Sequence, residues 1–203
     1  SFEYPIGVSQ TNIPTREKKF INNKKIGVYI LEEQEKALSD KAKLLILPEG
    51  TLNTDFKFQQ PIKVDTLVGG FRKDKGNLKS SLLAFKKGNN NFIGFIDKYR
   101  IVPLGEKVPN FLNKILNGGL SAIGGIEPGE RKSRFFKLDT HPPFAVAICY
   151  EISDGIQIRN AVKSGAEIIV STTNLDPYPN KIFDQFLALA RMRSIENNKD
   201  TLI

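Results

Sequence analysis

Three residues of this sequence, each at the end of a short apolar run, have side chains suited to covalent catalysis. They are Glu49, Lys98 and Cys149, and Cys149 is the only cysteine of the chain. A thiol held where a buried strand ends has the rigidity and exposure that a nucleophile needs. A shielded carboxylate can take its proton, while an ammonium group favours the thiolate and later an oxyanion. The residue types therefore indicate nucleophilic catalysis by cysteine, with a carboxylate as base and a cation as stabiliser.

A cysteine-histidine pair is an alternative, because a free thiol with a pKa of about 8.5 is mostly protonated at neutral pH. His141 is the only histidine, and it lies in a turn with two prolines just before the apolar run 144–148 that leads to Cys149. It should therefore lie about a strand length from the sulfur, at the wrong end. We interpret His141 mainly as a structural or solvated turn residue.

The elements that must position these side chains alternate along the chain, as in a layered α/β domain. Pro48 and Gly50 predict that the second strand ends before Glu49. Strands are expected at residues 4–9, 43–47, 66–71, 80–85, 91–96, 144–148, 167–172 and from 200 onward. Helices are expected at 14–39 with a break near 22–23, at 110–116, at 155–164 and at 181–197.

Composition limits the classes of protein that this chain can be. Its 203 residues are 40% hydrophobic and 26% charged, which is typical of one globular domain with a sizeable core. The apolar runs are far shorter than the roughly 18 to 20 residues of a membrane-spanning helix. One cysteine and one histidine predict neither a disulfide framework nor a usual zinc site, and we expect no metal and no cofactor. The start at Ser1, without an initiator methionine, is typical of an excised segment.

The chain is basic, with 30 Lys and Arg against 22 Asp and Glu, a net charge of +8. Such a balance can indicate nucleic acid or anionic lipid as a partner. Here the basic residues are spread over several clusters without a nucleic-acid-binding motif or an aromatic platform. We therefore expect no nucleic-acid partner and interpret these clusters mainly as solvated loops and helix faces. They are residues 16–19, 24–25, 72–75 and 131–134.

Three motifs, in this order along the chain, resemble those of the nitrilase superfamily. They are Leu45-Ile46-Leu47-Pro48-Glu49, the segment from Lys98 to Glu106, and Ile148-Cys149-Tyr150-Glu151. The resemblance implies a Glu-Lys-Cys triad. Glu49 then acts as general base, Lys98 as stabiliser of the tetrahedral intermediate and Cys149 as nucleophile.

The same resemblance implies further roles and a fold. Glu106 matches an additional glutamate that supports the triad, and Tyr150 and Glu151 are expected to orient the turn that carries the nucleophile. Simple packing is an equal alternative for Tyr150. The implied fold is α/β, a nitrilase-like α-β-β-α sandwich formed by residues 1–203 that ends before its last strands.

Further segments resemble the catalytic domain of the apolipoprotein N-acyltransferase family, namely Gln10–Pro14, Val102–Pro109, Gly165–Glu167 and Arg191–Asn197. That resemblance implies transfer of a fatty acyl chain from a phospholipid to the amino-terminal cysteine amine of a lipoprotein, through a cysteine thioester. It also implies a membrane region upstream, and a location at the outer face of the bacterial cytoplasmic membrane, the segment itself being soluble. Residues 173–178 and Phe186 depart from the family pattern. These departures affect the expected preference for an acyl donor more than the expected reaction.

Two alternatives remain at this point. A soluble carbon-nitrogen hydrolase, an amidase or nitrilase, would use the same triad with water as the second nucleophile. A binding domain without catalysis would keep Cys149 as a buried packing residue, which is a common role for a free cysteine. This second alternative predicts that Glu49, Lys98 and Cys149 lie far apart, or that the thiol has no access to solvent.

Overall fold

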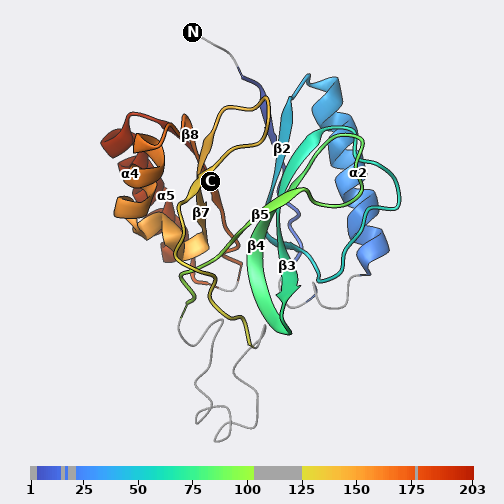
Figure 1. The fold of residues 1–203 in the computed structure, drawn as a ribbon, viewed down its shortest axis with the longest axis horizontal. Coiled ribbons are helices and arrows are strands. Elements are labelled where there is room, and N and C mark those ends of the chain that lie inside the picture. The colour runs from blue at the N-terminus through green and yellow to red at the C-terminus, as the bar shows by residue number, and fades with distance from the viewer. Residues whose placement is uncertain (1–3, 15–16, 18–21, 103–124, 177) are drawn as a thin grey trace, which may run out of the picture.

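Two β-sheets packed face to face, with helices on both outer faces, form the core of the protein (Figure 1). The computed structural model describes residues 4–14, 17, 22–102, 125–176 and 178–203. The first sheet has the strand order β1 (Ile6–Val8), β2 (Leu44–Leu52), β3 (Asp65–Asp74), β4 (Asn77–Phe85) and β5 (Gly94–Asp97). The second has the order β6 (Phe135–Phe136), β7 (Phe144–Ile148), β8 (Ile168–Thr172) and β9 (Asp200–Leu202).

The helices complete four layers. Helix α2 (Asn23–Ser39) covers the first sheet, and α4 (Gly155–Lys163) and α5 (Asn180–Asn197) cover the second (Figure 1). A short 3-10 helix, η1 (Cys149–Ser153), follows β7 directly. This arrangement confirms the α-β-β-α sandwich expected from the sequence. No helix among the described residues is long and apolar enough to cross a bilayer.

The apolar run at the start of β2 is buried on both faces, because the sheet lies between a helix and a second sheet. Leu44 and Ile46 belong to the core that the two sheets share, whereas Leu45 and Leu47 belong to the core under α2. Burying each such side chain contributes about 1.5–3 kcal/mol. The run therefore anchors β2, and with it Glu49, between two layers.

The structure corrects the predicted end of the second strand. β2 does not stop before Pro48 but runs on to Leu52, and its pairing with β3 resumes after an irregularity between Leu47 and Leu52. Pro48 is tolerated because it lies in this irregularity, where no ladder hydrogen bond is required of it. The strand β6 was not predicted, since two residues are too few to show a period.

Two turns explain where neighbouring elements begin. Helix α2 begins at Asn23, at the predicted break, because the side chain of Asn22 accepts a hydrogen bond from the Lys24 amide at 2.7 Å. The part of the predicted helix before this break lies largely outside the described residues. β3 and β4 are longer than predicted, because only Lys75 and Gly76 separate them, both with positive φ as a tight hairpin requires. The helix predicted at 110–116 lies outside the described residues.

His141 ties the two sheets together at the end remote from Cys149. Its Nε2 lies 2.6 Å from the Asp65 carboxylate at the start of β3, and its Nδ1 is hydrogen-bonded to the Tyr4 hydroxyl. The Lys87 amide donates to the other Asp65 oxygen at 2.6 Å. The imidazole is buried, and its contacts confirm that it is a structural residue.

The Tyr4 contact predicts a dependence of stability on alkaline pH. Burial, with the Asp65 carboxylate, raises the pKa of Tyr4 from 10.0 to about 12. Between these values the unfolded chain binds fewer protons than the folded one, so the free energy of unfolding falls as pH rises. The contribution is complete below about pH 10 and is lost as pH rises through about 12.

The measurement compares urea-unfolding midpoints of the wild type and Tyr4→Phe at about pH 9 and pH 11.5, on either side of the start of the Tyr4 titration. At the lower pH the wild type should have a higher urea midpoint than Tyr4→Phe. The difference between the two midpoints should become smaller at the higher pH. Other tyrosines and lysines titrate in both proteins and cancel in the difference. A gap that stays constant would contradict this role of Tyr4.

Candidate active site

Glu49 lies inside β2, in the irregular segment where that strand departs from its partner. From Leu47 to Leu52, β2 advances five residues while β3 advances two, from Val68 to Gly70. The extra residues form an irregular bulge of more than one residue, and bulges redirect side chains near active sites. The bulge places Glu49 in the interior, where 7% of the residue is exposed.

Lys98 follows β5 directly, as the sequence predicted, and reaches Glu49. Its ammonium Nζ donates to Glu49 Oε1 at 2.8 Å, and the Ser80 hydroxyl approaches the same oxygen at 3.5 Å. The Lys98 side chain is fully buried. Two opposite charges buried together in this way stabilise one another, which offsets part of the cost of removing both from water.

Cys149 is the first residue of η1, in a strained turn directly after β7. Its φ is +52°, in the left-handed region that a residue with a Cβ rarely adopts. Such a conformation costs on the order of 1–3 kcal/mol and persists only where the surroundings enforce it. Cys149 is 4% exposed and packs in the core shared by the sheets. The chain therefore holds its only thiol in a fixed direction at the end of a fully buried strand.

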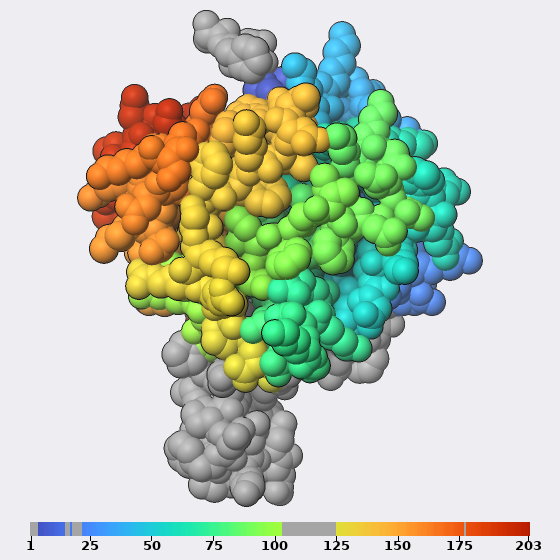
Figure 2. Space-filling model, viewed as in Figure 1, coloured from blue at the N-terminus to red at the C-terminus, as the bar shows by residue number. Residues whose placement is uncertain are grey.

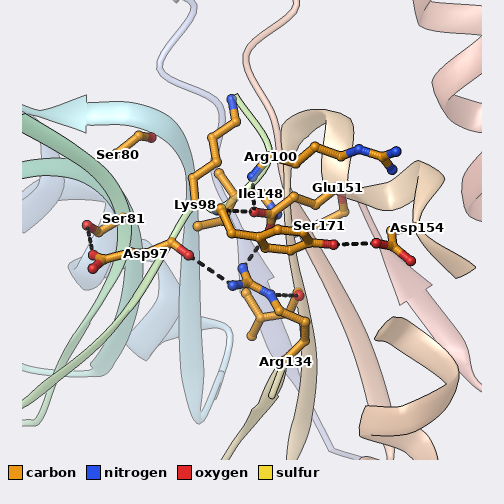
Figure 3. A network of polar contacts seen from close by, with 12 residues as sticks. Ser80, Ser81, Asp97, Lys98, Arg100, Arg134, Ile148, Glu151, Asp154 and Ser171 are labelled. Carbon is orange, nitrogen blue, oxygen red and sulfur yellow. Dashed lines mark hydrogen bonds and ion pairs between the residues drawn. The ribbon is translucent and has the colours of Figure 1, made fainter. Parts of the chain in front are cut away.

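Glu151 connects the Cys149 turn to the segment that contains Lys98 (Figure 3). Its Oε1 accepts hydrogen bonds from the amides of Tyr99 at 2.7 Å and Arg100 at 3.3 Å. Its Oε2 accepts from the amide of Ile148 at 2.9 Å. One buried carboxylate thus joins the two sheets at the point where the residues of interest lie, which supports the predicted orienting role of Glu151.

Arg134 completes this network, and no local pattern in the sequence indicates this role. The basic cluster 131–134 predicts a solvated side chain here, but Arg134 is 3% exposed and its guanidinium forms an ion pair with Glu151 at 2.6 Å. Burial raises the pKa of Glu151 and lowers the pKa of Arg134, and each partner opposes the shift of the other. Among the described residues, the groups that hydrogen-bond to the Glu151 carboxylate are all donors, namely three backbone amides and the Arg134 guanidinium. A protonated carboxyl would need an acceptor for its own O–H, so we assign Glu151 the ionised form.

The remaining predicted residues have different outcomes. Tyr150 is 42% exposed, and the Arg100 guanidinium carbon lies 5.1 Å from the centre of its ring. This stacking keeps Tyr150 at the surface of the turn and not in the core. Glu106 lies outside the described residues. Among the residues that the structure describes, no group of three or more His, Cys, Asp and Glu could hold a metal ion.

A cleft of about 520 Å³ lies beside the bulge of β2 and includes Pro48, the neighbour of Glu49, in its wall. One part of its lining is polar and comes from the segment after β1 and the segment after β8. The other part is apolar and includes Phe183, Phe186 and Leu187 of α5. Two of these, Phe183 and Leu187, are exposed large side chains. The cleft can therefore take a ligand that has both a polar and an apolar part.

Relatives of known name match nearly the whole chain. An apolipoprotein N-acyltransferase of Prochlorococcus marinus subsp. pastoris is 57% identical over 201 residues, which are 99% of this chain and 40% of that protein. One of Parasynechococcus marenigrum is 42% identical over 201 residues, which are 97% of this chain and 42% of that protein. The chain thus spans about two fifths of the length of these curated relatives. No model of a protein family matches the sequence.

Solved structures support the fold. A carbon-nitrogen hydrolase from Helicobacter pylori has a TM-score of 0.67 at 16% identity, covering 98% of this chain and 74% of that one. An amidase of the nitrilase superfamily from Nesterenkonia has a TM-score of 0.64 at 13% identity, covering 98% of this chain and 76% of that one. Both resemblances expected from the sequence are confirmed: the chain is a relative of the apolipoprotein N-acyltransferases and has the fold of the nitrilase superfamily.

Proposed function

We propose that this chain forms the catalytic part of an N-acyltransferase that uses Cys149 as its nucleophile. The acyl donor is a phospholipid, and the acceptor is the amine of the amino-terminal cysteine of a lipoprotein. The observation that carries the chemistry is the buried pair of Lys98 and Glu49 at 2.8 Å, next to a segment that Glu151 joins to the Cys149 turn. The names of the relatives support transfer to an amine over hydrolysis.

The first half-reaction forms the thioester. Glu49 accepts the thiol proton of Cys149, and the thiolate attacks the ester carbonyl carbon of the phospholipid. Lys98 and backbone N–H groups of the Cys149 turn stabilise the oxyanion of the tetrahedral intermediate. The carbon-oxygen bond then breaks, the lysophospholipid takes the proton from Glu49, and the acyl group stays on the sulfur.

The second half-reaction transfers the acyl group to nitrogen. The amine of the lipoprotein attacks the thioester carbonyl, Glu49 accepts the amine proton, and the carbon-sulfur bond breaks. The proton then returns to the sulfur, which restores the starting enzyme. Both half-reactions need the same oxyanion stabilisation, so one Lys98 position serves both.

The strained conformation of Cys149 argues against a purely packing role for this residue. A cysteine that only fills a core gains nothing from a positive φ, which costs free energy and must be enforced by its neighbours. The Lys98–Glu49 pair does not fit the wide separation that a binding domain without catalysis predicts for these two residues. The other feature that this alternative predicts, a thiol without access to solvent, fits the 4% exposure of Cys149, and the adduct experiment below decides between the two functions. In a solved structure with the same fold, the Nesterenkonia amidase, acrylamide has added to the active site cysteine.

The cleft beside Pro48 is suited to the proposed donor. Its apolar wall from α5 can accompany a fatty acyl chain, while its polar wall can face the ester end. Because the donor is a membrane lipid, we also propose that the complete protein works at the bacterial cytoplasmic membrane, with this part on the outer face. Apolar membrane segments elsewhere in the complete protein would then hold the cleft close to the lipid.

Intact-protein mass spectrometry tests the proposal. The complete protein that carries this chain is incubated with phospholipid vesicles as wild type, Cys149→Ala and Glu49→Gln. The wild type should acquire one acyl adduct that hydroxylamine removes, because hydroxylamine cleaves thioesters. Cys149→Ala should acquire none, and Glu49→Gln should acquire it at least about 100-fold more slowly, as expected when a general base is lost.

Three other results would contradict the proposal. Hydrolysis of small amides by the wild type without an acyl adduct would favour a carbon-nitrogen hydrolase. Neither an adduct nor hydrolysis, with the same result for all three proteins, would favour a binding domain. An adduct that also forms on Cys149→Ala would contradict the assignment of the nucleophile.

A further inference from the structure

We propose that Arg134 is a positioning residue that sets the direction of the Lys98 side chain relative to the Cys149 turn. The inference rests on the proposed function, because it concerns the geometry of the same reaction. Arg134 belongs to the segment before β7. In Figure 2 this segment is yellow and lies between the green residues of the first sheet and the orange residues near the C-terminus. It is 3% exposed and contacts elements of both sheets.

The first contact fixes the peptide group before Lys98. Arg134 Nη1 donates to the carbonyl oxygen of Asp97 at 2.9 Å, and the Lys98 N–H of the same peptide group donates to the Ser80 carbonyl at 2.8 Å. A peptide group is planar, so hydrogen bonds at both of its ends fix its orientation. Figure 3 shows the bond from Arg134 reaching the end of β5 from below the network.

The second contact acts on the peptide group after Lys98. Its carbonyl oxygen accepts from the Gly129 amide at 2.8 Å, and its N–H, that of Tyr99, donates to Glu151 at 2.7 Å. Arg134 holds that carboxylate through its Nη2 at 2.6 Å. Both peptide groups that flank Lys98 are therefore fixed, which sets φ and ψ of Lys98 and the direction in which its side chain leaves the backbone.

The third contact ties the same guanidinium to the strand that carries the nucleophile. Arg134 Nε donates to the Val146 carbonyl of β7 at 3.1 Å, and Glu151 accepts from the Ile148 amide, one residue before Cys149. A planar guanidinium can serve three acceptors at fixed angles, which an ammonium group cannot. Arg134 thus sets the distance between the Lys98 backbone and the Cys149 turn.

The test compares Arg134→Lys with the matched control Arg72→Lys in the complete protein. Arg72 also binds Asp97 and is mostly buried, but its Nε donates to the side-chain carboxylate at 2.7 Å and not to the peptide group. Both variants keep their charge. Arg134→Lys should lower kcat of acyl transfer by about 100-fold with little change in KM, the size of loss expected from small misplacements of catalytic groups. Arg72→Lys should stay within about threefold, since it leaves both peptide groups held.

A second measurement needs no acyl donor. The rate of Cys149 alkylation by iodoacetamide is followed against pH, because only the thiolate reacts. If Arg134 positions Lys98, the midpoint of this profile should move to higher pH in Arg134→Lys and stay in place in Arg72→Lys. A shifted profile in a protein that never forms an acyl adduct would keep the positioning role and refute the proposed function.

Several outcomes would overturn the inference. One is an Arg134→Lys variant with the thermal midpoint of Arg72→Lys and an unchanged kcat and alkylation profile. A wild-type profile with the midpoint of a free cysteine would also overturn it, since Lys98 would then not favour the thiolate. If Arg134→Lys does not fold, hydrogen exchange of the wild type decides. The amides of Lys98 and Tyr99 should exchange only on global unfolding, and fast exchange of either would refute their fixation.

Discussion

Lys98→Met should slow acyl transfer by at least about 10²–10³-fold and also destabilise the protein strongly. The side chain is fully buried and its ammonium lies 2.8 Å from Glu49. Methionine leaves that carboxylate buried without its cation, which costs about 3–5 kcal/mol. Loss of the oxyanion stabiliser should lower kcat by a further factor of at least about 10²–10³. Thermal unfolding and the rate of acyl-adduct formation measure the two effects separately.

The double variant Lys98→Met/Glu49→Gln separates stability from chemistry. Without either charge, the buried pair carries no uncompensated ion, so much of the lost stability should return. Activity should not return, because both the base and the stabiliser are missing. If Lys98→Met keeps its activity within about fivefold of the wild type, Lys98 does not stabilise the transition state. If the double variant is no more stable than Lys98→Met, the unpaired Glu49 carboxylate is not the cause of the lost stability.

Gly69→Ala should disrupt the bulge that carries Glu49. A Cβ at position 69 would lie 2.3 Å from the Glu49 Cα and 2.5 Å from the Pro48 carbonyl oxygen. Both are backbone atoms, so no side-chain rotation can relieve the clash, and the bulge itself must move. We expect the free energy of unfolding to fall by about 1–3 kcal/mol. Moving Glu49 away from Lys98 should also lower kcat by about 100-fold.

Gly94→Ala is the matched control for this prediction. Gly94 lies in β5 of the same sheet, and its added Cβ would meet only the Phe136 ring, at 3.6 Å, an ordinary contact. This variant should unfold within about 0.5 kcal/mol of the wild type and keep its activity. Urea unfolding and initial rates compare the two variants. Equal stability and equal rates would show that the backbone of the bulge yields without moving Glu49.

Local patterns were sufficient to predict most of the elements. Runs such as 44–47 and 144–148 are apolar because their strands are buried on both faces, and the turn and capping residues between them have recognisable types. The position of Lys98 after β5 and of Cys149 after β7 followed from the ends of these runs. The order of three short motifs resembled the nitrilase superfamily, whose fold the chain shares, and further segments resembled the apolipoprotein N-acyltransferases, to which named relatives belong.

Local patterns failed where a residue depends on a distant partner. Pro48 and Gly50 have the composition of a strand end, yet β2 continues because β3 offers a second register beyond the bulge. Arg134 lies in a basic cluster whose other charged members are exposed, and nothing in its own segment indicates that Glu151 and the Asp97 carbonyl surround it. Burial of a charge is decided by what packs against it.

The sequence by itself therefore determined which side chains could react, Glu49, Lys98 and Cys149, and the layered fold that holds them. It did so because side-chain chemistry and hydrophobic periodicity are local properties of a chain. Only the tertiary structure decided how Lys98 meets Glu49 and how Arg134 and Glu151 join the two sheets. Those contacts depend on distances between segments far apart in sequence, and packing of the whole core sets such distances to within a few tenths of an ångström.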